Sequence, residues 1–104
     1  MIYEKKIVEQ YGEEYIIRQL AEEAAELCQA ALKLVRAMRN ETPIRQIDAQ
    51  SHLLEEMADV EVMLSVMRKG VLTEEADKRI KAIGAKKFGR MVTRLIMDDA
   101  LDND

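Results

Sequence analysis

Two short acidic motifs contain the residues in this chain that are best suited to do chemistry. Glu22, Glu23 and Glu26 form the pattern Glu-Glu-x-x-Glu, and Glu56 and Asp59 form Glu-x-x-Asp. Residues three apart in a helix lie on neighbouring positions of one face, so both carboxylates of such a pair can reach one ion. Two such helices packed antiparallel would bring four carboxylates together. These four belong to Glu23, Glu26, Glu56 and Asp59.

The neighbours of the second motif place its acids in apolar surroundings. On a helical wheel Glu56 falls among Val60, Met63 and Met67, and Asp59 shares the same side of the helix. Charged groups in such a place are costly unless they are protonated, paired with cations or bound to metal. A group of carboxylates without nearby cysteines or paired histidines favours Mg²⁺, with Mn²⁺ as a possible substitute.

Two other interpretations compete with a metal site. Charged residues make up 35% of the chain, and glutamate is a good helix former. Either acidic pair alone is therefore more often the solvated side of a helix, although the presence of both pairs weakens this reading. Structural ion pairs with Arg18, Lys33 or Arg68 are the second interpretation, and the sequence leaves it open.

Apolar periodicity predicts two helices in the first part of the chain. A short helix over residues 2–11 is followed by Gly12, which marks its end. Residues 13–39 contain no proline or glycine, and their apolar residues recur at three- and four-residue steps, which predicts a long amphipathic helix. The only proline, Pro43, lies among polar residues and predicts a loop over residues 40–48.

A third helix is predicted over about residues 49–69. Asp48 or Ser51 lies near its expected start, and Gly70 lies just past its expected end. Because this helix carries the second acidic motif, it must pack antiparallel to the helix over residues 13–39 for the two motifs to meet.

A fourth helix is predicted to begin after Thr73, a candidate N-cap followed by two glutamates. It extends at least to Ile83, but Gly84 and Gly89 leave its end undefined. The acidic tail over residues 98–104 is expected to fray. The predicted fold is an all-α four-helix bundle, with residues 1–104 forming a single domain.

Composition narrows the setting in which this domain works. A domain of 104 residues has a modest core and often gains stability by forming a homodimer or homotetramer. The net charge of −4 lacks the positive field expected of a surface that binds a nucleic acid polymer. The sequence contains no long uncharged apolar run of the kind that predicts a membrane segment. Its N-terminus lacks the basic-then-apolar pattern of a signal peptide. With Cys28 as the only cysteine, these features favour a cytoplasmic protein.

The two motifs resemble the signature of the MazG-like all-α nucleoside triphosphate pyrophosphohydrolases. Glu22, Glu23 and Glu26 match the first part of that signature, and Glu56 and Asp59 match the second. The likeness covers roughly residues 13–88 in helix order and loop placement. The stretch between the motifs is somewhat long for the family, and the chain has no tryptophan, a residue that often lines the base pocket of members specific for deoxynucleotides.

The resemblance implies an oligomeric enzyme that cleaves a nucleoside triphosphate between its α- and β-phosphates. By position, the Mg²⁺ ligands would be the four carboxylates named above. Glu22, with Glu23 beside it, would assist catalysis, either near the ion or by orienting the attacking water. Among the basic residues after the second motif, Lys86 and Lys87 are the first candidates to hold the terminal phosphates, although most such residues form solvated helix faces.

Three alternatives stay open beside this reading. The first is a phosphoribosyl-ATP pyrophosphohydrolase, which shares the helical carboxylate plan. The second is a di-iron carboxylate protein, which is disfavoured because it needs Glu-x-x-His motifs. The third is a non-catalytic helical oligomerisation module. His52, one turn before Glu56, either contacts that carboxylate or serves as a surface or capping residue, which is the commoner role of a lone histidine.

Overall fold

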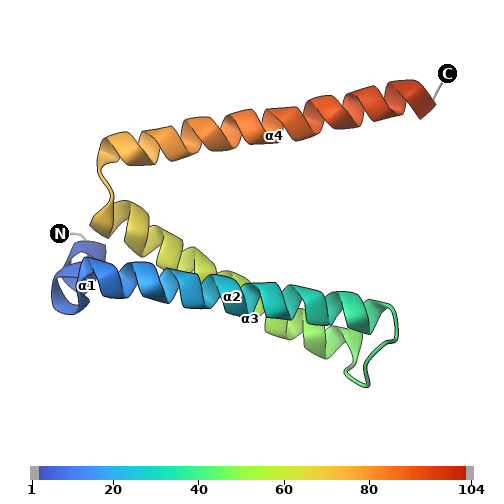
Figure 1. Cartoon of the computed structure of the whole chain (residues 1–104), viewed down its shortest axis with the longest axis horizontal. Helices are drawn as coiled ribbons and strands as arrows, with labels where there is room; N and C mark the ends of the chain where they lie inside the picture. The colour runs from blue at the N-terminus through green and yellow to red at the C-terminus, as the bar shows by residue number, and fades with distance from the viewer. Residues whose placement is uncertain (1–2, 103–104) are drawn as a thin grey trace. The chain divides into compact units, whose positions relative to one another are not determined.

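The structure, a computed structural model, describes residues 3–102 and is all-helical over this range. Four α-helices follow one another along the chain (Figure 1): α1 (Tyr3–Tyr11), α2 (Glu13–Met38), α3 (Gln46–Val66) and α4 (Glu74–Asp102). A π-helical turn, η1 (Met67–Val71), continues α3. This confirms the predicted all-α class. The chain divides into two compact units between Val71 and Leu72.

The first unit is built on α2 and α3, which lie side by side and antiparallel (Figure 1). Buried alanines, Ala30 and Ala37 on α2 and Ala49 on α3, lie on this pair of helices. Small side chains at such positions allow helix backbones to approach closely. The predicted antiparallel pairing of the two motif-bearing helices is therefore confirmed.

The loop between α2 and α3 is shorter than the sequence predicts, because α3 begins at Gln46 and not at residue 49. Asn40, which follows the C-cap Arg39 of α2, has a positive φ of 58°, a conformation that asparagine tolerates better than most residues. Arg45 is the N-cap, and its Nε donates to Asp48 Oδ2 at 2.9 Å. Asp48 thus lies within the first helical turn, where a carboxylate stabilises the positive end of the helix dipole.

Gly12 separates α1 from α2, as predicted. Its backbone has φ 92° and ψ 150°, a combination that is essentially restricted to glycine. Its N–H donates to the carbonyl of Val8 at 2.7 Å, which closes the end of α1. The predicted first residue of this helix, Ile2, lies outside the described residues.

The end of α3 differs from the prediction that Gly70 would follow the helix. Gly70 instead lies inside η1, against α1. A Cβ atom at this position would lie 2.7 Å from the carbonyl oxygen of Glu4 and 2.7 Å from Val8 Cγ2. The missing side chain is what allows the backbone of α1 to pack this closely against the turn.

A small apolar cluster joins α1 to the helix pair. Val8, Ile16 and Val66 are its buried members, one from each of α1, α2 and α3. Met63, Met67 and Val71 pack against them and are partly buried. This cluster lies where α2 begins and α3 ends, so it fixes how α1 sits on the unit.

The second unit consists mainly of α4. Thr73 Oγ1 accepts a hydrogen bond from the N–H of Ala76 at 3.1 Å, which confirms the predicted N-cap. The helix continues through Gly84 and Gly89 to Asp102. Of the tail over residues 98–104 that the sequence predicts to fray, residues 103–104 lie outside the described residues. Each glycine costs only about 1 kcal/mol relative to alanine, too little to stop a long helix with good helix formers on both sides.

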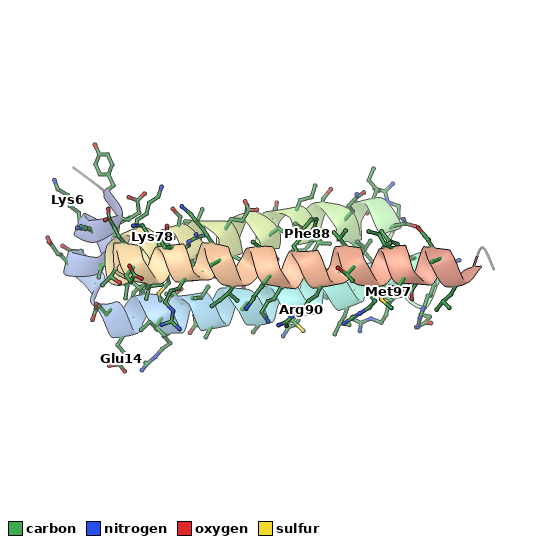
Figure 2. All side chains as sticks on the ribbon, turned by 90° about the horizontal axis from the view of Figure 1, so that it is seen from above. Lys6, Glu14, Lys78, Phe88, Arg90 and Met97 are labelled. Atoms are coloured by element: carbon green, nitrogen blue, oxygen red, sulfur yellow. The ribbon has the colours of Figure 1, made fainter. Side chains whose placement is uncertain are left out.

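Figure 2 shows Phe88 and Arg90 leaving α4 on opposite sides.

No described helix combines enough length with enough apolar character to cross a membrane.

Candidate metal centre

Three acidic side chains meet between α2 and α3. Glu23 comes from α2, and Glu56 and Asp59 come from α3; one carboxylate oxygen from each lies within 4.8 Å of the other two. The three-residue step places Glu56 and Asp59 on one face of α3, and the antiparallel pairing brings Glu23 opposite them. Three of the four predicted ligands are thus brought together.

These carboxylates are not equally accessible. Glu56 is buried with only 9% of its surface exposed, Glu23 is partly buried, and Asp59 is exposed. Within residues 3–102, the oxygens Glu23 Oε2 and Glu56 Oε2 are buried and have no hydrogen-bond partner. An unsatisfied buried acceptor is costly, and an unsatisfied buried charge more so. A cation between these side chains would remove that cost.

The clustering raises the pKa of the two glutamates. Burial is the main reason that the pKa of Glu23 lies above its ordinary value of 4.5, and the charges of Glu26, Asp59 and Glu56 raise it further. Burial also leads for the pKa of Glu56, followed by the charges of Glu26 and Asp59, while His52 opposes the rise. Both carboxyl groups therefore ionise less readily than a glutamate in water.

The remaining two acids of the first motif take different positions. Glu26 does not belong to the group of three, but its carboxylate is near enough to raise the pKa of both Glu23 and Glu56. Glu22 is exposed and accepts a hydrogen bond from Gln19 Nε2 at 3.2 Å on its own helix. Glu26 thus lies beside the cluster, and Glu22 faces solvent next to it.

His52 contacts the buried glutamate. Its Nε2 lies 3.3 Å from Glu56 Oε1, and 44% of the histidine side chain is exposed. Of the two roles that the sequence left open for this residue, the structure supports the contact with Glu56. The four-residue spacing was the available signal, because residues four apart in a helix are neighbours on its surface.

One of the predicted structural cations lies near a different acid. Arg18 forms an exposed ion pair with Glu14, one turn earlier on α2, at 2.8 Å. An exposed pair at this spacing contributes a few tenths of a kcal/mol at most.

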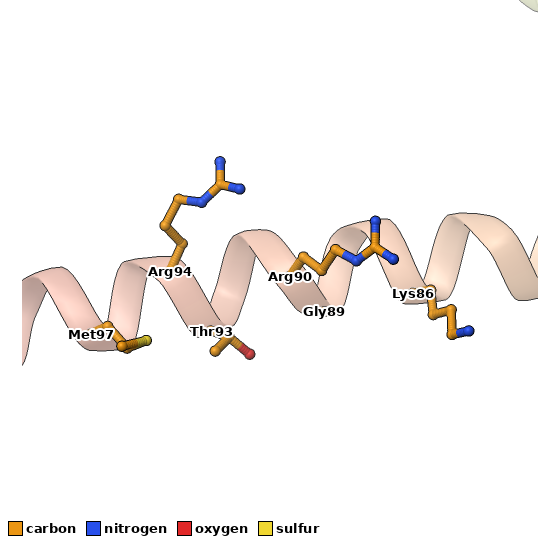
Figure 3. Close-up of a pocket in the computed structure, with 6 residues that line it drawn as sticks. All are labelled: Lys86, Gly89, Arg90, Thr93, Arg94 and Met97. Carbon is orange, nitrogen blue, oxygen red and sulfur yellow. The ribbon is translucent and has the colours of Figure 1, made fainter.

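The predicted phosphate-binding lysines lie on α4, in the second unit. A pocket on this helix is lined by Lys86, Gly89, Arg90, Thr93, Arg94 and Met97, and Figure 3 shows that all six side chains or backbones come from α4 alone. These residues and Lys87 are exposed. The role of Lys86 and Lys87 toward a substrate stays a prediction.

The donor set of the acidic cluster fits Mg²⁺. The ion prefers octahedral oxygen coordination at 2.0–2.1 Å, so neighbouring ligand oxygens are about 2.9 Å apart and opposite ones about 4.2 Å. Three carboxylate oxygens within 4.8 Å of one another can reach one such ion after the side chains draw closer together. Two of the carboxylate oxygens, Glu23 Oε2 and Glu56 Oε2, are buried without a hydrogen-bond partner, and oxygens of this kind are the donors that a hard cation prefers.

Comparison with known proteins adds no family or relative to this picture. No family model matches the chain, and no similar chain is found among curated proteins or solved structures.

Proposed function

We propose that the chain is a Mg²⁺-dependent nucleoside triphosphate pyrophosphohydrolase. The observation that carries the proposal is the pair of buried, unpartnered oxygens on Glu23 and Glu56, beside Asp59. The resemblance of the two acidic motifs to the MazG-like enzymes supports the choice of reaction. Assembly into a dimer or tetramer with a MazG-like bundle core is part of the same proposal.

Each acidic residue has a role in this reaction. Glu23, Glu56 and Asp59 would hold the ion, and Glu26 beside them would be the fourth ligand. Bound Mg²⁺ would neutralise the charge that builds up on the phosphate oxygens during cleavage. Glu22, exposed at the edge of the cluster, orients the attacking water together with Glu23. That Lys86 and Lys87 hold the β- and γ-phosphates stays a prediction from the sequence.

Water attacks the α-phosphorus, and the bond from that phosphorus to the bridging oxygen breaks. The products are a nucleoside monophosphate and pyrophosphate. Hydrolysis in oxygen-18 water should therefore label the monophosphate and leave the released pyrophosphate unlabelled. Label in pyrophosphate, or release of inorganic phosphate with a diphosphate product, would disprove this mechanism.

A substrate panel separates the remaining alternatives. The purified protein is incubated with Mg²⁺ and canonical or modified nucleoside triphosphates, and in parallel with phosphoribosyl-ATP, while pyrophosphate release is measured. Turnover of phosphoribosyl-ATP alone would identify the specialised enzyme. Absence of turnover with every substrate, together with a stable oligomer, would favour the non-catalytic module.

A further inference from the structure

The two carboxylate oxygens of Glu56 have different surroundings, because only one of them contacts His52. Oε1 lies 3.3 Å from His52 Nε2, whereas Oε2 is buried without a hydrogen-bond partner among residues 3–102. Glu56 is also nine-tenths buried and belongs to the group of three acids. One end of the carboxylate is thus engaged by the protein, and the other is available to a cation.

The geometry of α3 explains why the histidine can do this. His52 and Glu56 are four residues apart, so their side chains extend from successive turns of one face. A glutamate side chain has several rotatable bonds, and fixing it costs conformational entropy. A partner that already holds one oxygen removes part of that cost before any ion binds.

We infer that His52 is a positioning residue for the acidic cluster: through Nε2 it holds Oε1 of Glu56 and leaves Oε2 free for a divalent cation. The inference rests on the proposed metal site. Ligand carboxylates are generally held by outer partners of this kind, and loss of such a partner weakens metal affinity about 10- to 100-fold. His52 itself touches neither the ion nor the substrate.

The test compares His52→Leu with His52→Gln in the full chain. Leucine removes the N–H donor, while glutamine keeps one on a side chain of similar reach. The probe is Mg²⁺ alone, and its apparent Kd is taken from the concentration dependence of the melting temperature. Gln50→Leu, at an exposed position of the same helix, controls for the effect of a surface leucine on α3. Circular dichroism verifies that every variant is folded.

We expect His52→Leu to bind Mg²⁺ about 10- to 100-fold more weakly than the unchanged protein. His52→Gln should recover most of the affinity, and Gln50→Leu should not alter it. Unchanged affinity in His52→Leu would overturn the inference and leave the metal site intact, as would equal weakening in the leucine and glutamine variants. A protein in which Mg²⁺ shifts no melting temperature at all would overturn the metal site and the inference together.

Discussion

Glu23 and Glu56 are glutamates of the acidic cluster that combine burial with close acidic neighbours. Because burial and neighbouring acids raise the pKa of Glu23 and Glu56 above 4.5, the folded state keeps protons that the unfolded chain has released. The free energy of unfolding of the metal-free protein therefore decreases as the pH rises from about 4.5 through the raised pKa values. This contribution to stability is fully present only below the pKa of the unfolded chain.

Glu56→Gln should weaken this pH dependence, because the amide cannot ionise. The measurement is urea unfolding in the presence of a chelator at pH 5 and pH 8. We expect the unchanged protein to lose stability relative to Glu56→Gln between these two values. Glu55→Gln, at the exposed neighbouring position, serves as the control and should follow the unchanged protein. Parallel pH profiles for the protein and Glu56→Gln would contradict the raised pKa.

Glu56→Gln and Asp59→Asn should both abolish pyrophosphate release while the helical circular dichroism is preserved. Neutral isosteres keep the side-chain volume but remove the charge that holds the ion. They should also remove the stabilisation by Mg²⁺, which for the unchanged protein reaches about 2.7 kcal/mol at a concentration 100 times the Kd. Near-normal turnover by either variant would show that its residue is not a ligand.

Helical spacing was sufficient to predict which acids of α3 lie together, but not how near each acid of α2 comes to them. Glu23 and Glu26 are separated by about 60° around the helix axis, since three residues turn through about 300°. Their distances to the acids of α3 depend on the rotation of α2, and packing against α3 determines that rotation. Glu23 joins the group of three, and Glu26 lies beside it, near enough to raise the pKa of Glu56.

At the scale of elements, the junction between α1 and η1 makes the sharpest prediction. Gly70→Ala would place a methyl group 2.7 Å from the Glu4 carbonyl oxygen and from Val8 Cγ2. Backbone must move to relieve that overlap, and overpacking of this kind costs about 1–3 kcal/mol. Urea unfolding should show the loss.

Gly84→Ala on α4 provides the matched control. A Cβ at that position meets nothing within 4 Å, so alanine should favour the helix by up to about 1 kcal/mol. The same substitution thus has opposite signs at the two glycines. A Gly70→Ala protein as stable as the unchanged chain would mean that α1 does not pack closely on η1.

The elements also show where local sequence rules stop. Thr73 caps α4 as its type and position indicate, because that hydrogen bond involves only neighbouring residues. Gly70 looked like a helix end, but a contact with α1, distant in the sequence, keeps it inside a helical turn. Similarly, the low helix propensity of Gly84 and Gly89 suggested that α4 would end near them. The good helix formers around these two glycines outweigh that low propensity.

At the scale of the whole molecule, the first unit leaves many large apolar side chains exposed and buries few. Its core cluster is small, and the outer side of α3 exposes large apolar residues to 43–64% of their surface. These residues are Ile47, Leu54, Met57, Val62 and Leu64. A helix that is apolar on most sides is typical of one that is covered by further protein.

We therefore expect a dimer or tetramer at micromolar concentration. Light scattering coupled to size exclusion measures the mass directly, and Leu54→Glu should lower it by placing a charge on the apolar side of α3. Glu61→Gln, a polar change at an exposed position of the same helix, should leave the mass unchanged. A monomer in the unchanged protein would contradict the expectation.

The close packing of α1 against Gly70 has a consequence for folding during translation. α1 is synthesised before α2 and α3, but the glycine that accommodates it lies at position 70, after both of these helices. Until the turn at residues 67–71 has left the exit tunnel, the apolar side of α1 lacks the surface that covers it. α1 is consequently among the last parts of the first unit to reach its final place during translation.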